Sequence, residues 1–70
     1  MASHTLTGQT WVAFTQIGAV GSVHRVIDGF TFKLVKDEDY RGVYPTLDTA
    51  KSALHANLLP GAAWPEFREH

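Results

Sequence analysis

The sequence predicts an α+β domain: an antiparallel meander sheet of three to four strands with one C-terminal helix packed on one face. Three observations lead to this prediction: short runs rich in β-branched and aromatic residues, turn residues between these runs, and one apolar stripe with helical spacing. A chain of 70 residues is one domain at most. We expect a flexible N-terminus over residues 1–9, the meander over 10–44, the helix over 46–59 and a tail over 60–70.

Three strand-like runs precede the helix, and turn residues separate them. The runs cover residues 10–17, 22–27 and 30–35. The sequence GAVG at 18–21 predicts the first turn. Asp28-Gly29 predicts a type I′ hairpin, because both central residues of that turn need a positive φ. Residues 40–44 are a candidate fourth strand, although Gly42 weakens it.

The helix has clear start and stop signals. Pro45 ends the preceding strand, since it cannot donate a ladder hydrogen bond, and Thr46 is a candidate N-cap. Pro60-Gly61 ends the helix. A helix of about twelve residues is unstable alone in water, so we expect it to lie on the sheet. The apolar stripe that would face the sheet consists of Leu47, Ala50, Ala53, Leu54 and Leu58.

The turn at Asp28-Gly29 divides the side chains between two faces, because neighbours along a strand alternate. The face predicted under the helix holds Val12, Phe14, Val23, Ile27, Phe30, Phe32 and Leu34, with Arg25 as the exception. The opposite face holds Trp11, Ala13, Thr15, Ile17, Ser22, His24, Val26, Thr31, Lys33 and Val35. The faces assigned to the side chains of the first strand depend on the length of the first turn, since a shift of one residue in the strand pairing would move Trp11 into the core.

Apolar and polar residues mix on the predicted open face, and such a face needs an explanation. The tail could cover it with Trp64 and Phe67, a second copy of the chain could pack on it, or a partner could bind it. Arg25 needs either an ion pair, with Asp28 or Asp48, or a rim position from which its guanidinium reaches water.

Composition limits the function classes. The chain has no cysteine, which excludes disulfides and thiolate zinc sites. The chain has six Lys and Arg residues and seven Asp and Glu residues, and its net charge of −1 disfavours binding to nucleic acid. No apolar run approaches the length of a membrane helix, and the first residues do not form a secretory signal. We therefore expect a cytoplasmic protein with no membrane partner.

The sequence shows no motif typical of a catalytic or metal-binding site. The spacing of His4, His24, His55 and His70 matches no metal-binding motif. The acids at 37–39 are adjacent on a charged turn, which is typical of a solvated loop, and no serine lies in a nucleophile elbow. We expect no cofactor, no metal and no enzymatic activity.

The segment VYPTLDTAKSAL at 43–54 resembles the sheet-to-helix junction of the arm-type DNA-binding domains of phage-type tyrosine integrases. It is similar, more loosely, to plant AP2-type DNA-binding domains. The matching residues are Tyr44, Pro45, Leu47, Ala50 and Ala53. The resemblance implies a three-stranded sheet backed by one helix, and a DNA-facing surface with Trp11, His24, Thr31 and Lys33. Those families carry several basic residues on that surface, whereas this chain has one Lys and one His there.

The hypothesis from the sequence is a small non-catalytic interaction module. It would bind a protein partner or itself, as a homo-oligomer, through the open sheet face or the aromatic C-terminal tail. The alternative is a nucleic-acid-binding domain that uses the same face. The candidate contact residues are Trp11, His24, Arg25, Val26, Thr31, Lys33, Trp64 and Phe67.

Overall fold

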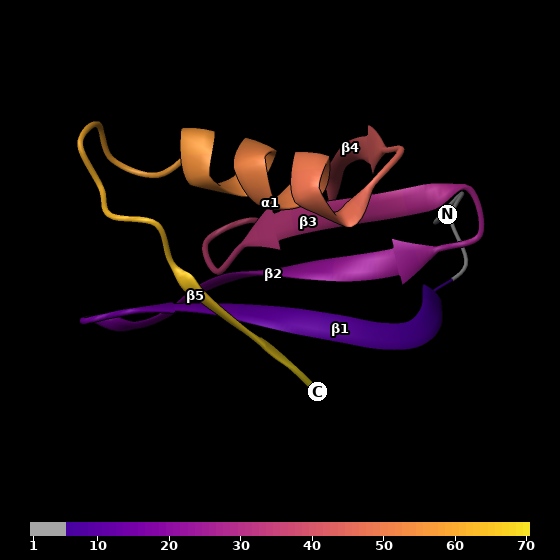
Figure 1. Cartoon of the computed structure of the whole chain (residues 1–70), viewed down its shortest axis with the longest axis horizontal. Coiled ribbons are helices and arrows are strands. Elements are labelled where there is room, and N and C mark those ends of the chain that lie inside the picture. Colours follow the sequence, from indigo (N-terminus) through magenta and orange to yellow (C-terminus); the bar gives the residue numbers. More distant parts are fainter. Residues whose placement is uncertain (1–5) are drawn as a thin grey trace.

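The computed structural model describes the chain from Leu6 to His70, without the side chains of Leu6 and Thr7 (Figure 1). The elements are β1 (Leu6–Thr15), β2 (Gly18–Val26), β3 (Gly29–Leu34), β4 (Arg41–Tyr44), α1 (Leu47–Ala56) and β5 (Glu66–Glu69). Strand β1 begins earlier than the predicted start at residue 10. The sequence predicts a flexible N-terminus over residues 1–9. Residues 1–5 of that range lie outside the described residues.

The strands form one antiparallel sheet in the order β4-β3-β2-β1-β5. The α+β class and the meander of the first four strands are confirmed. The prediction of three to four strands and a C-terminal helix is wrong, because β5 follows the helix and pairs with β1 (Figure 1). The sequence EFRE of β5 contains three charged residues in four, so it carries no strand signal of its own.

The β2–β3 hairpin keeps the predicted division of faces but has a different turn. Val26 pairs with Gly29, so the turn residues are Ile27 and Asp28, and no described residue other than glycine has a positive φ. The predicted type I′ turn at Asp28-Gly29 is therefore wrong. Gly29 takes a φ of 148° beside the turn, and a Cβ there would clash with the Tyr44 carbonyl. Ile27, predicted in the core, is 77% exposed at the turn.

The β1–β2 hairpin overturns the predicted faces of the first strand. Thr15 pairs with Gly18, so the turn residues are Gln16 and Ile17, and the GAVG segment belongs to β2. Trp11 pairs with Val23, which places Trp11 on the helix face, the side of the sheet that α1 covers. The side chains of Val12 and Phe14, predicted in the core, alternate with it and belong to the opposite, open face.

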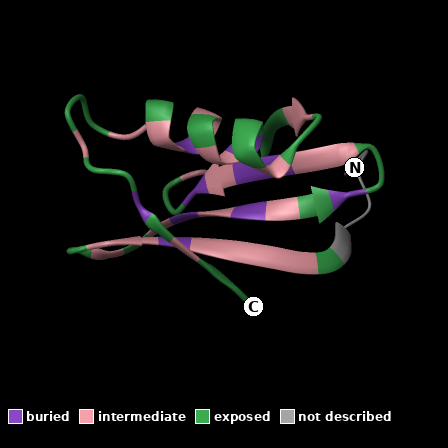
Figure 2. Cartoon of the chain, in the orientation of Figure 1, coloured by how far each residue is buried: buried purple, intermediate pink, exposed green. Residues whose placement is uncertain are grey.

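The core lies between α1 and the central strands (Figure 2). Its buried residues are Ala13, Val23, Phe32, Leu34, Ala50 and Leu54. The rest of the predicted helix stripe, Leu47, Ala53 and Leu58, packs against this core. Gly21 leaves room for Leu54, since a Cβ at Gly21 would lie 2.7 Å from the Lys33 carbonyl oxygen and 3.2 Å from Leu54 Cδ1.

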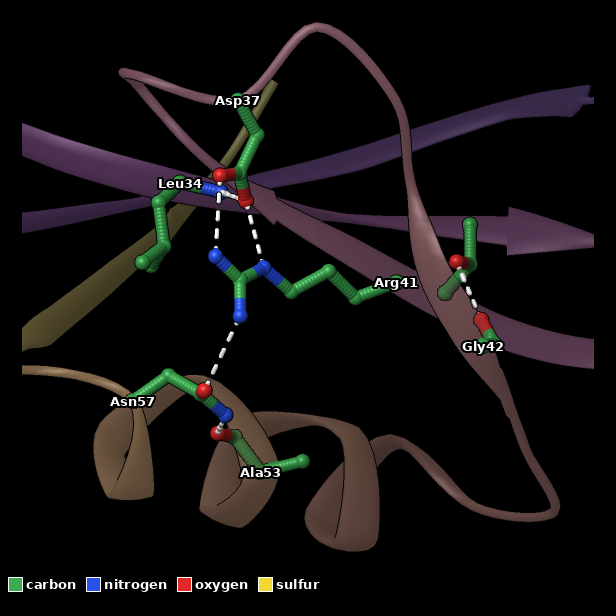
Figure 3. Close-up of polar contacts among 7 residues, drawn as sticks. Leu34, Asp37, Arg41, Gly42, Ala53 and Asn57 are labelled. Carbon is green, nitrogen blue, oxygen red and sulfur yellow. Dashed lines mark hydrogen bonds and ion pairs between the residues drawn. The ribbon is translucent and has the colours of Figure 1, made fainter.

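Both ends of α1 are tied by side chains. At the start, the Thr46 Oγ1 accepts a hydrogen bond from the Thr49 N–H at 3.1 Å, which confirms the predicted N-cap. At the end, Arg41 donates to the Asn57 Oδ1 at 3.0 Å (Figure 3). The end of α1 is thereby held to the first residue of β4 and, through its bonds to Asp37, to the loop between β3 and β4.

Asp37 is the centre of this loop (Figure 3). Its carboxylate accepts two hydrogen bonds from Arg41, at 2.7 and 2.9 Å, and one from the Leu34 N–H at 3.0 Å. These hydrogen bonds lower the pKa of Asp37 to about 2, and the hydrogen bonding from Arg41 has the largest effect. The ionised carboxylate therefore orients Arg41 toward the C-terminal end of α1, where the chain turns toward β5.

Candidate functional site

A hollow of about 790 Å³ opens at the end of the molecule where the β1–β2 turn meets the loop between α1 and β5. These two segments lie at the same end of the fold (Figure 1). The walls come from the β1–β2 hairpin, from the loop 58–64 and from β5. We call it the terminal hollow. Its lining residues are Phe14, Thr15, Gln16, Ile17, Val20, Leu58, Leu59, Ala62, Ala63, Trp64, Glu66 and Arg68.

Large apolar side chains stand exposed around the terminal hollow. Ile17 is 89% exposed, Leu59 is 82% exposed and Trp64 is 55% exposed. The other exposed large apolar residues in the described part of the chain, Ile27, Val35 and Tyr40, do not line it. The fold therefore gathers half of these side chains, three of six, on one concave surface.

Ring contacts and a backbone anchor hold Trp64. Its ring centre lies 5.0 Å from that of His55 on α1 and 6.0 Å from that of Phe67 on β5. His55 Nε2 lies 2.9 Å from the Ala62 carbonyl oxygen, which can only accept, so Nε2 carries the proton. Pro65, the next residue after Trp64, is buried. The indole is thus fixed from the helix side while more than half of its surface faces solvent.

Opposite charges lie at the rim of the terminal hollow. Arg68 donates to Glu66 at 3.0 and 3.3 Å and lies over the Phe14 ring, 5.2 Å from its centre. The hydrogen bond and the charge of Arg68 lower the pKa of Glu66. Both side chains are exposed, so this ion pair is an accessible polar edge beside an apolar surface.

His24, one of the predicted contact residues on the open face, is held through both of its ring nitrogens. Its Nδ1 lies 3.1 Å from Thr10 Oγ1, and its Nε2 lies 2.8 Å from Ser22 Oγ. Its ring meets the Tyr40 ring edge to face, with centres 4.9 Å apart. Burial, and to a smaller degree the charge of Lys33, lowers the pKa of His24 below 6.5. Both ring nitrogens are therefore already occupied within the domain.

The open face offers less free surface than the sequence suggests. Lys33 is half-buried, and its ammonium lies 5.1 Å from the centre of the Tyr40 ring. Val26 and Thr31 are buried, and Thr31 donates to the Gly42 carbonyl. These residues contact other parts of the domain, which makes the open face a weaker candidate than the terminal hollow.

Trp11, Phe67 and Arg25 lie apart from these residues. Trp11 packs on the helix face, with its ring centre 5.9 Å from that of Phe30, so its predicted place on the open face is wrong. Phe67 is half-buried against the core, and the Lys51 ammonium lies 5.0 Å from its ring centre. Arg25 is exposed and donates to the Gln9 side chain at 3.0 Å. Only Trp64, among the predicted contact residues, lines the terminal hollow.

The terminal hollow offers apolar contact and one ion pair. Within residues 6–70, no three His, Asp or Glu side chains gather closely enough to hold a metal ion. Every buried side-chain nitrogen or oxygen in that range has a hydrogen-bond partner. No helix of the described chain is long and apolar enough to cross a bilayer.

Ile17 and Leu59 were missed as contact residues for a local reason. The sequence predicts Ile17 at the end of a strand, whereas the structure places it in the two-residue turn after Thr15, with its side chain in solvent. Leu59 stands directly before Pro60-Gly61, where the chain has already left the helix. An apolar residue at such a breaker is the sequence signal that could have marked this surface.

No protein-family model, curated protein or solved structure matches this chain. The resemblance of segment 43–54 to integrase arm-type and AP2-type domains stays a prediction, as does the nucleic-acid alternative.

Proposed function

We propose that this chain is a small non-catalytic interaction module that binds an apolar segment of a protein partner in the terminal hollow. The observation that carries the proposal is the convergence of exposed Ile17, Leu59 and Trp64 on one concave surface. Exposed apolar side chains that cluster on a small domain, rather than scatter, are typical of interaction sites.

Trp64 supplies the anchor for this interaction. Tryptophan is enriched among the residues that contribute most to protein interfaces, because it covers a large apolar area at a small cost in side-chain entropy. Its contacts with His55 and Phe67 hold the indole before a partner arrives. Binding to a surface that is already ordered loses less conformational entropy.

The size and rim of the terminal hollow favour a peptide segment over a single small group. A volume of about 790 Å³ accommodates several side chains. Glu66 and Arg68 at the rim offer an acceptor and a donor to a partner's backbone or charged side chains. The partner surface that fits is therefore apolar in the centre and polar at the edge, as in many protein interfaces.

The test is a selection of peptides from a random display library on the immobilised protein, followed by affinity measurement. We expect peptides with an apolar centre, and we expect Ile17→Asp or Trp64→Ala to weaken their binding at least about tenfold. Ile27→Asp is the matched control, because Ile27 is also an exposed isoleucine in a two-residue hairpin turn but lies outside the hollow. No enrichment, or equal losses for Ile17→Asp and Ile27→Asp, would contradict the proposal.

A further inference from the structure

The two edges of the sheet differ in regularity. Strand β4, at one edge, pairs with β3 through a shifted register and contains Gly42 with a φ of 64°. Strand β5, at the other edge, pairs with β1 in an unbroken register. Bulges and kinks protect an edge from further pairing, whereas a regular edge offers a row of free N–H and C=O groups. The β5 edge is therefore the more regular of the two and the better suited to accept another strand.

The direction of the β5 backbone groups follows from one hydrogen bond. The His70 N–H donates to the Thr10 carbonyl at 2.8 Å, so residue 70 bonds toward β1. Hydrogen-bonded and non-bonded pairs alternate along an antiparallel ladder. Arg68 therefore also bonds toward β1, while the N–H and C=O groups of Phe67 and Glu69 point to the outer edge.

We propose that the outer edge of β5 pairs with β5 of a second copy of this chain, antiparallel and about a two-fold axis at Phe67. In this register the two Phe67 residues exchange two hydrogen bonds. The Glu69 N–H of each copy faces Pro65 of the other, and the missing N–H of proline ends the ladder there. The two sheets then form one continuous sheet across the axis.

Charge complementarity selects this register. A two-fold axis can lie at any of the four residues of β5, since only such registers place outward-pointing groups opposite each other. An axis at Glu66, Arg68 or Glu69 places that residue opposite its own copy, with like charges in contact. An axis at Phe67 instead places each Glu66 opposite Arg68 of the other copy, which gives two favourable ion pairs.

The same register brings apolar surface together. The two Phe67 rings lie opposite each other on the helix face, where each ring already packs against its own core and Lys51. A four-residue strand buries a small interface, so we expect a weak dimer. The terminal hollow shares Glu66 and Arg68 with this pairing, whereas Ile17 and Leu59 line the hollow and take no part in the strand pairing, so variants at Ile17 separate the two proposals.

Charge exchange tests the register. Sedimentation of the full chain from about 10 μM to about 1 mM is expected to show a monomer–dimer equilibrium. Glu66→Arg and Arg68→Glu are each expected to weaken dimerisation at least about tenfold, because like charges then face each other twice. The double variant Glu66→Arg/Arg68→Glu, and an equimolar mixture of the two single variants, are expected to restore the dimer.

A backbone substitution provides a second test. Glu69→Pro removes an outward N–H and leaves the bonds to β1 intact, so we expect weaker dimerisation than for the control Glu69→Ala, with an unchanged circular dichroism spectrum. Ile17→Asp is expected to leave the dimer unchanged, which separates this proposal from the function of the hollow. A wild-type chain that stays monomeric at 1 mM, or a double variant that dissociates like the single ones, would overturn the proposal.

Discussion

The single residue His24 shows why the open face has few free polar atoms for a partner. Hydroxyls of Thr10 and Ser22 lie within hydrogen-bond distance of both ring nitrogens, and Tyr40 covers the ring. A protonated imidazole is disfavoured there, because burial removes water and Lys33 adds a positive charge. The neutral form of His24 is thus part of the folded structure.

This environment predicts a pH dependence of stability. Well above pH 6.5 His24 is neutral in the folded and the unfolded chain. As the pH falls through 6.5, the unfolded chain binds the proton first, since the pKa of His24 is lower in the folded state, and the free energy of unfolding decreases. We expect His24→Gln to reduce this loss between about pH 7 and about pH 5 in urea titrations. Equal slopes for both proteins would contradict the assignment.

Asp37 affects a different pH range. Its pKa falls from 3.8 to about 2 on folding, so its contribution to stability is complete above about pH 4 and is lost as the pH falls toward 2. The effects of His24 and Asp37 on the free energy of unfolding therefore fall in different pH ranges. Of the two residues, His24 is the one whose effect falls near neutrality.

Individual residues also show which sequence signals were sufficient. The alternation of Val23, Phe32 and Leu34 correctly predicted the core side of β2 and β3. Asp28-Gly29 indicated a reversal at the correct place but with the wrong turn residues. The face of the sheet that Trp11 occupies could not be predicted. It depends on the position of the turn before Gly18, and the two residues of that turn, Gln16 and Ile17, are not strong turn formers.

At the scale of the element, α1 is the best-predicted part of the fold. Its N-cap and its apolar side are local features, and both are confirmed. The predicted end at residue 59 is wrong, because the helix ends at Ala56 with Asn57 as its C-cap, before Pro60-Gly61 is reached. The helix is short, so it depends on its cap and on burial against the sheet.

Thr46 therefore has a measurable role. Thr46→Ala removes the acceptor for the Thr49 N–H and leaves a helix-start donor unpaired. We expect the free energy of unfolding to fall by about 1 kcal/mol in urea denaturation. Ser52→Ala, at an exposed position inside the same helix, is the control and is expected to cause no loss. Equal effects for the two variants would contradict the capping role.

Strand β5 is the element that sequence reasoning could not predict. Its four residues become a strand through pairing with β1, more than fifty residues earlier in the chain. Charged residues suit such a position, since an edge strand exposes most of its side chains. Phe67 in the tail did indicate burial, and it packs against the core as a strand residue.

At the scale of the whole molecule, β5 creates both candidate surfaces. Its pairing with β1 carries Trp64 toward Ile17 and completes the terminal hollow. It also leaves one regular edge with a self-complementary charge pattern. The hollow joins residues that lie far apart in the sequence, so the sequence pointed to the aromatic tail but not to its neighbours.

The central claim is that β5 pairs with β1 as an edge strand, and amide hydrogen exchange tests it most directly. At a concentration low enough to keep the chain monomeric, we expect slow exchange at the Arg68 amide and fast exchange at the Phe67 and Glu69 amides. This alternation requires a strand with one bonded and one free edge. Uniformly fast exchange over residues 66–69 would contradict the pairing and, with it, both the terminal hollow and the proposed dimer.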